Sequence, residues 1–177
     1  MNKIMIRKLS LIPIFICLLC SLLLFSGCDD NPGVIINPNA TQNPGSSSYK
    51  FKSGTLEIYI FQEFSQVKAV LGDPVNYYES PSCGYTGMDV FYQYKGFELT
   101  VNDIEGKKLI TDIYIVDDTV SIPEGLKIGD GEDKINSLLG TNYEKDGKAY
   151  NFKDGNTLLQ ILVEDNVVKA IEYKPAN

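Results

Sequence analysis

The sequence has no histidine and no tryptophan, and its only arginine is Arg7. Without histidine the chain lacks the usual acid–base catalyst at neutral pH and the commonest nitrogen ligand of zinc and copper. Beyond Arg7 it also lacks the guanidinium group that binds phosphate in a bidentate manner. Lys and Arg number 16 against 23 Asp and Glu, a net charge of −7. We expect no nucleic-acid partner, because such binding requires clustered cations.

The beginning of the chain has the composition of an export signal. Three basic residues precede an apolar run at 9–25, and two small residues follow it. A basic start, an apolar middle and a small-residue cleavage site are the parts of a secretory signal. The run is short for a membrane-spanning helix, and Pro13 interrupts it. We therefore expect residues 1–27 to be a signal peptide.

The residues Leu-Phe-Ser-Gly-Cys that end at Cys28 resemble the lipobox of bacterial lipoproteins. The resemblance implies cleavage before Cys28 and a diacylglyceryl group on its sulfur. That lipid would anchor the protein to the cell membrane, on the outer face of the cytoplasmic membrane. The alternative is an uncleaved anchor in which Cys28 has no role, and both place the remaining chain outside the cytoplasm. After cleavage 13 lysines face 23 acids, a net charge of about −10.

Cysteine becomes scarce once the signal is removed. Cys17 and Cys20 leave with the signal and Cys28 carries the lipid, so Cys83 is the only thiol that remains. We therefore expect no intramolecular disulfide and no cysteine-based metal cluster in the folded part.

Residues 28–48 separate the lipid anchor from the folded part. After the cysteine they are rich in Asn, Pro, Gly and Ser and sustain neither a helical nor a strand period. Such a composition is typical of a flexible tether, and 20 residues of it reach roughly 25 Å. We expect the folded domain to begin at Tyr49.

Two short amphipathic segments, 64–71 and 132–139, each end at a glycine, and these glycines lie 68 residues apart. Apolar residues recur on one face of each segment, which predicts two helices. Gly72 and Gly140 suit the positive φ that follows a last helical turn. Asp130 is predicted to be the N-cap of the second helix.

After each helix the period becomes strand-like, with turn residues between the strands. The predicted strands are 88–94, 97–101 and 109–116 in the first part, and 149–152, 158–163 and 167–173 in the second. Two lead-in strands are predicted before the helices, at 56–61 and 125–128. The fold class is therefore α+β, with two tandem repeats, 49–118 and 119–177. Each is a short helix followed by an antiparallel β-meander, and the repeats share a core because a 60-residue unit is marginal alone.

These residues resemble known envelope families. The order Gly125-Leu-Lys-Ile-Gly129, helix, Leu139-Gly140 and meander resembles the repeat of the β-lactamase-inhibitory-protein-like and SmpA/OmlA-like proteins. The segment 82–89, followed by Asp117-Asp118 and Pro123-Glu124-Gly125, is similar to a group of uncharacterised Gram-positive-type lipoproteins. The resemblance implies this fold and a habit of binding other proteins. It implies no reaction.

Catalytic and metal-binding patterns are weak in this sequence. Cys83 is the most reactive candidate nucleophile, but no histidine can activate it. No spacing singles out a pair of carboxylates for glycoside chemistry. The acids at 117–118 and 130–133 do not match a calcium-binding loop and are expected to be turn acids and a helix cap. We predict no enzyme, no cofactor and no metal ligand.

Binding residues are predicted in the segment 76–87, NYYESPSCGYTG, which is expected to be a loop found only in the first repeat. Tyrosines, small residues and no basic residue form adaptable contact surfaces. The competing interpretation is that the tyrosines only pack over the sheet and bind no partner. The predicted binding residues are Tyr77, Tyr78, Ser82, Cys83, Tyr85 and Asp89.

The functional prediction is an envelope lipoprotein that binds another envelope protein or a peptide without catalysis. The alternative is an extracytoplasmic sensor of a ligand or of Ca²⁺, or a small hydrolase that uses acidic residues.

Overall fold

The computed structural model describes residues 47–176. The predicted signal peptide, the predicted lipidation site at Cys28 and the predicted tether up to residue 46 lie outside the described residues. Within the described part, no helix combines the length and the apolar character that crossing a membrane requires.

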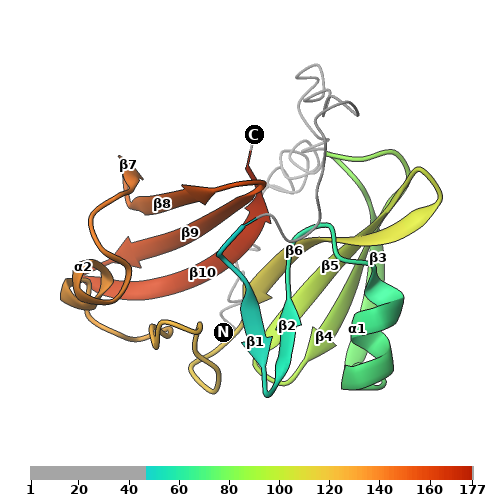
Figure 1. The fold of residues 1–177 in the computed structure, drawn as a ribbon, viewed down its shortest axis with the longest axis horizontal. Coiled ribbons are helices and arrows are strands. Elements are labelled where there is room, and N and C mark those ends of the chain that lie inside the picture. The colour runs from blue at the N-terminus through green and yellow to red at the C-terminus, as the bar shows by residue number, and fades with distance from the viewer. Residues whose placement is uncertain (1–46, 177) are drawn as a thin grey trace, which may run out of the picture. The chain divides into compact units, whose positions relative to one another are not determined.

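The described chain is mostly β, with two short helices (Figure 1). In chain order the elements are β1 (Phe51–Ser53), β2 (Leu56–Ile58), α1 (Phe64–Leu71), β3 (Asn76–Pro81), β4 (Met88–Tyr94), β5 (Phe97–Ile104), β6 (Lys107–Ile115), α2 (Asp133–Leu139), β7 (Glu144–Asp146), β8 (Ala149–Asp154), β9 (Thr157–Glu164) and β10 (Val167–Pro175). The α+β class is confirmed.

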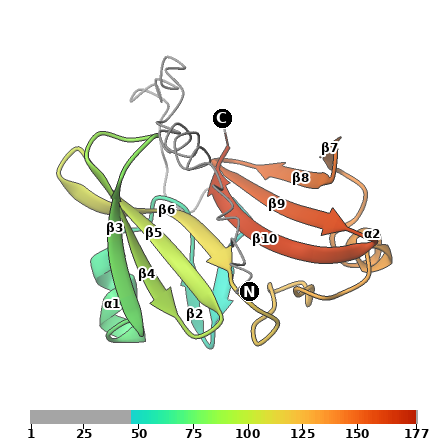
Figure 2. The same cartoon turned by 180° about the vertical axis from the view of Figure 1, so that it is seen from behind.

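Eight strands form one antiparallel sheet in the order β3-β4-β5-β6-β10-β9-β8-β7 (Figures 1 and 2). Short turns connect the strands of each group of four, and β6 pairs with β10 at the centre. The hairpin β1–β2 forms a separate two-stranded sheet. All six strands predicted within the meanders are present.

The helices lie where their amphipathic patterns place them. Gly72 and Gly140 follow them with φ values of 79° and 78°, as predicted. Asp130 is not the N-cap of α2, since Glu132 occupies that position. The Asp130 carboxylate instead accepts the backbone N–H of Lys127 at 3.1 Å and pairs with Lys134 Nζ at 2.5 Å.

Three strand predictions need correction. Residues 125–128 are not a strand, because Ile122 N–H donates to the Leu126 carbonyl and closes a turn there. The lead-in strand at 56–61 ends early, as β2 stops at Ile58. Residues 76–87 are not a loop, since their first half is β3; only 82–87 form a turn.

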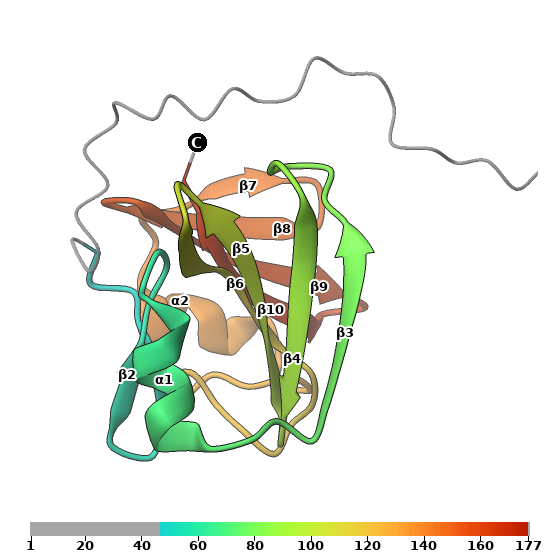
Figure 3. The same ribbon diagram turned by 90° about the vertical axis from the view of Figure 1, so that its right-hand side faces the viewer.

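The core lies on one face of the eight-stranded sheet. Its central residues follow one register row across the sheet: Tyr92, Leu99, Ile113, Tyr173, Leu159 and Phe152. Helix α1 packs here through Phe64, whose ring stacks on Tyr92 with the centroids 4.1 Å apart. The hairpin adds Phe51 and Ile58, both without exposed surface. Figure 3 shows α1 and the hairpin on the same side of strands β3–β5. The burial alternates with the strand period, so the opposite face is left to polar residues.

Candidate functional site

The opposite face of the sheet carries a continuous row of polar side chains, which we call the polar row. Its members are paired in register across all eight strands, from β3 to β7: Asn76, Gln93, Glu98, Tyr114, Glu172, Gln160, Asn151 and Glu144. Because side chains on a strand alternate between faces, one register row holds one face throughout. None of these side chains belongs to the buried core.

Hydrogen bonds hold the first half of the polar row in place. Asn76 Nδ2 donates to Gln93 Oε1 at 3.2 Å, and Gln93 Nε2 donates to Glu98 Oε2 at 2.9 Å. Tyr78 OH, from the neighbouring row, also reaches the Glu98 carboxylate at 3.4 Å. These contacts fix the side chains without covering them.

The second half is held in the same manner. Lys174 Nζ donates to Glu172 Oε2 at 2.9 Å and to Gln160 Oε1 at 2.8 Å. Gln160 Nε2 in turn donates to Asn151 Oδ1 at 2.8 Å. Between the halves lies Tyr114, which keeps 39% of its surface exposed. An exposed tyrosine therefore marks the centre of the face.

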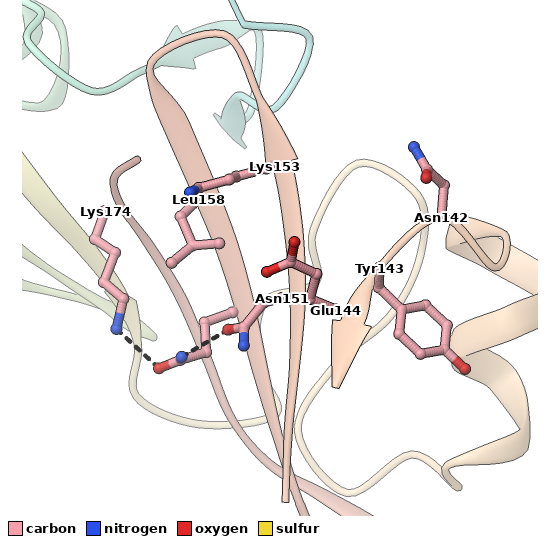
Figure 4. A pocket seen from close by; sticks show the side chains of 8 residues that line it. Asn142, Tyr143, Glu144, Asn151, Lys153, Leu158 and Lys174 are labelled. Carbon is pink, nitrogen blue, oxygen red and sulfur yellow. Dashed lines mark hydrogen bonds between the residues drawn. The ribbon is translucent and has the colours of Figure 1, made fainter. Parts of the chain in front are cut away.

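Two cavities open on this face, one on each side of Lys174. The first, of about 440 Å³, is lined by the last three members of the polar row, Gln160, Asn151 and Glu144, together with Asn142, Tyr143, Lys153, Leu158 and Lys174. Figure 4 shows its lining and the hydrogen bonds that run from Lys174 to Asn151. The second, of about 410 Å³, lies over β4, β5, β6 and β10 and beneath the turn 82–87.

The second cavity brings together four of the six predicted binding residues: Ser82, Cys83, Tyr85 and Asp89. The Ser82 Oγ accepts the N–H of Tyr85 at 2.9 Å, which closes the turn over the cavity. Tyr78 lies on the same face of the sheet, stacked on Phe91 at 4.5 Å, but does not line the cavity.

Tyr77 is the predicted residue that the structure separates from the others. Tyr77 directly precedes Tyr78, and neighbouring side chains of a strand point to opposite faces of the sheet. Tyr77 therefore points to the core side, where its ring stacks on that of Tyr92 with the centroids 6.0 Å apart. The six predicted residues therefore do not form a single surface.

A polar network forms one wall of the second cavity. Asn102 Nδ2 donates to Asp89 Oδ1 at 2.5 Å, and Thr111 Oγ1 donates to Asn102 Oδ1 at 2.5 Å. Asn102 and Thr111 are both buried, so their hydrogen bonds satisfy groups that would otherwise be costly to withdraw from water. The network thereby fixes the position of Asp89.

The floor of the second cavity holds a pair of carboxyl groups that the sequence spacing did not reveal. Burial, a hydrogen bond to Glu172 and the charge of Glu172 raise the pKa of Asp112 to about 9, against an opposing effect of Lys174. Asp112 therefore keeps its proton at pH 7 and donates a hydrogen bond to Glu172. Burial, with the charges of Asp89 and Asp112, raises the pKa of Tyr85 to about 12.

Cys83 does not offer a free thiol. Its sulfur is disulfide-bonded in the full chain, whose other cysteines, at 17, 20 and 28, lie outside the described residues. The expectation of no intramolecular disulfide concerns the chain after its signal is removed, and it stays a prediction. A disulfide-bonded sulfur is not a nucleophile.

Asp117 and Asp130, one from each acidic cluster that was compared with a calcium-binding loop, accept hydrogen bonds from the protein itself. Asp117 Oδ1 accepts the N–H of Thr119 at 2.8 Å and its hydroxyl at 2.5 Å, as expected of a turn acid. Asp130 is held by Lys127 and Lys134. Among residues 47–176 there is no group of three or more His, Cys, Asp or Glu placed to hold a metal ion.

No family model matches the sequence, and no curated protein matches it. Among solved structures, an extracellular protein containing an SCP domain from Bacillus anthracis is similar with a TM-score of 0.48 and 14% identity over 66% of this chain. A cysteine-rich secretory protein from Staphylococcus aureus gives 0.44, with 14% identity over 66%. This chain covers 44% of each of those two proteins. A DUF4309 family protein (YjgB) from Bacillus subtilis gives 0.40, with 15% identity over 65% of this chain and 79% of that one.

Proposed function

We propose that this protein is a cell-envelope lipoprotein whose folded domain binds another protein or a peptide and catalyses no reaction. The observation that supports the proposal is the polar row, which extends over all eight strands on a face that neither helix nor the hairpin covers. The lipobox-like residues at Cys28 support the anchoring, and the residues up to 46 supply the tether.

The face has the properties of a recognition surface. Its polar side chains are already hydrogen-bonded to one another, so little side-chain entropy is lost when a partner docks. Exposed apolar groups lie among them: Tyr78, Tyr114 and Leu162 have 44%, 39% and 40% of their surface accessible. Tyrosine surrounded by a polar rim is the usual composition of a protein-binding patch.

The proposal is tested by photo-crosslinking in the cells that make the protein, using the full chain. A photoreactive amino acid is placed at Tyr114 or Leu162 on the uncovered face. Matched controls place it at Val70 on α1 and at Leu138 on α2, which are also exposed apolar residues. We expect one protein or peptide adduct, identified by mass spectrometry, from both sheet positions and from neither helix position.

Equal adducts from all four positions, or adducts from the helices alone, would contradict the proposal. The same would follow if the sheet positions gave no adduct while the protein was shown to be exported and folded.

A second candidate function, hydrolysis by acid–base catalysis, is favoured by one observation. A carboxyl group with a raised pKa, hydrogen-bonded to a second carboxyl group in a cavity, is an arrangement that can divide acid and base roles. The direct hydrogen bond between Asp112 and Glu172 makes them closer than the roughly 5 Å or more that glycosidase pairs require. Turnover of nitrophenyl esters by the protein, abolished by Asp112→Asn, would establish this function in place of the first.

We further propose that the two halves are tandem repeats. In each half the first strand after the helix begins four residues after the glycine that ends the helix. This strand is β3, from Asn76 after Gly72, in the first half and β7, from Glu144 after Gly140, in the second. Each of these first strand residues is also the outermost member of the polar row. The longer first half accommodates the turn at 82–87.

A further inference from the structure

The two edges of the sheet are unequal, and the β3 edge is the open one. β3 has six residues, and only Ser80 among them is not exposed. Within residues 47–176, β3 pairs with β4 alone. Pro74 precedes the strand and Pro81 ends it, so the open edge is limited to 75–80. An open edge of this length is a template for another strand.

β3 is held rigidly in the sheet although it is exposed. The Tyr77 ring stacks on Tyr92 on the core side, and the Tyr78 ring stacks on Phe91 on the other side at an angle of 10°. Asn76 adds the hydrogen bond to Gln93. Because both faces of β3 are stacked against β4, the backbone of the edge is ordered before any partner arrives, which lowers the entropic cost of adding a strand.

The charge around this edge is of one sign. Between Lys68 and Lys95 the sequence has no basic residue, while it has three acids: Asp73, Glu79 and Asp89. Asp73 pairs with Lys68 at 3.6 Å and Asp89 is bonded to Asn102. Glu79, in the middle of the open strand, takes part in no ion pair among the described residues.

The exposed tyrosines favour the same kind of partner. Tyr77 keeps 57% of its surface exposed and Tyr78 keeps 44%. A lysine or arginine on an adjacent strand can lie over such a ring and gain a cation–π contact. A second copy of this chain would instead bring together two strands whose only charge is acidic and two strongly acidic domains, which electrostatics opposes.

We propose that β3 accepts an extended, cationic segment of the partner as a ninth strand of the sheet. This inference rests on the proposed protein-binding function and names how the partner is held and what charge it carries. Main-chain hydrogen bonds supply the attachment, and lysine or arginine side chains opposite Glu79 and the two tyrosines supply the preference.

The test uses the full chain and a blocked, fluorescent peptide in which lysine alternates with valine and threonine. Binding is measured by fluorescence polarisation at about 0.15 M salt, where long-range attraction is screened. Three further peptides serve as comparisons: one with glutamate in place of lysine, and two in which alternate backbone nitrogens are methylated, on the odd or on the even residues. Only alternate N–H groups of an added strand point toward its neighbour.

We expect the cationic peptide to bind, the glutamate peptide not to bind, and methylation of only one of the two sets to abolish binding. Glu79→Lys should weaken binding about tenfold, since an opposite-charge pair across strands becomes a like-charge pair. The matched control is Asp146→Lys, which makes the same charge change on an exposed residue of the other edge, β7, outside the polar row, and should leave binding within about twofold.

Loss of binding with both methylated peptides, retention with both, or equal weakening by Glu79→Lys and Asp146→Lys would overturn strand addition at β3. Dimerisation of the unliganded chain that Glu79→Lys abolishes would overturn it too, because the occupant would then be a second copy. If the peptide does not bind while the crosslinked adduct on the uncovered face persists, this inference alone fails. If neither is seen, the proposed function fails with it.

Discussion

The two edge strands of the sheet, β3 and β7, differ in length, in charge and in the contacts of their side chains. β3 has six residues with two tyrosines and a single acidic charge, whereas β7 has three residues, Glu144, Lys145 and Asp146. Lys145 Nζ is further tied to Glu132 Oε1 at 3.0 Å and to Tyr150 OH at 2.7 Å. A short edge with charges of both signs resists strand addition. The second half therefore protects its edge strand, β7, against pairing, whereas the first half leaves its edge strand, β3, open to pairing with another strand.

The largest effect is expected where the two halves are joined. Ile113 is fully buried beside Leu99 and Tyr173, one from each half. Ile113→Ala should lower the free energy of unfolding by about 3 kcal/mol, from lost burial and the cavity left behind. Because the two halves share this row of core residues, unfolding in urea should remain a single transition, whether it is followed by tyrosine fluorescence or by circular dichroism. Two separate transitions would show that the halves are independent units.

The next effect concerns the carboxyl pair at the same junction and depends on pH. The pKa of Asp112 is raised to about 9 in the folded chain, from an ordinary value of 3.8. Between these values the unfolded chain binds fewer protons than the folded chain, so stability falls as pH rises, by at most about 1.4 kcal/mol per pH unit.

Asp112→Asn removes this dependence because an amide can donate to Glu172 without ionising. Near Asp112 the remaining charged groups are Glu98, Glu172 and Lys174. We expect the variant to be more stable at pH 8, on the order of 2 kcal/mol, with a flatter curve from pH 5 to 9 in urea titrations. A wild-type stability that rises over this range would contradict the account, and Asp103→Asn, at an exposed position in β5, is the control.

The smallest effect sharpens the difference between the edges. Tyr78→Ala removes the stack on Phe91 and should lower the free energy of unfolding by about 1 kcal/mol. Amide hydrogen exchange should become faster in β3 while β7 keeps its rates, because the stack holds only the first edge in place. Equal acceleration at both edges would mean that the ring supports the whole sheet.

The sequence was sufficient for most elements that bury apolar residues, but not for β1, a three-residue strand that buries only Phe51. Helix α1 and the six inner strands were predicted because each has an apolar residue at every turn or at every second position. The edge strands were missed for a physical reason: β7 has no apolar residue, and β3 is exposed on both faces, so neither carries an alternating burial signal. Asp130 has the residue type of an N-cap, but Lys127 and Lys134 compete for its carboxylate.

The candidate site was predictable only where its residues are neighbours in the chain. Ser82, Tyr85 and Asp89 come together because one turn and the start of the strand that follows it, β4, carry them. Asp112 and Glu172 meet only because β6 pairs with β10, a pairing between distant strands that no local pattern encodes. Strand alternation would have placed each of the two on the polar face, but not beside the other.

The most direct test of the central claim is the affinity of the crosslinked partner for the wild-type chain and for Tyr114→Ala. Tyr114 lies at the centre of the uncovered face, and truncating a central aromatic residue usually weakens binding the most. We predict that the variant, shown to be folded by circular dichroism, binds the partner about tenfold or more weakly. Equal affinity of the two chains would contradict the claim that the uncovered polar face is where this protein binds.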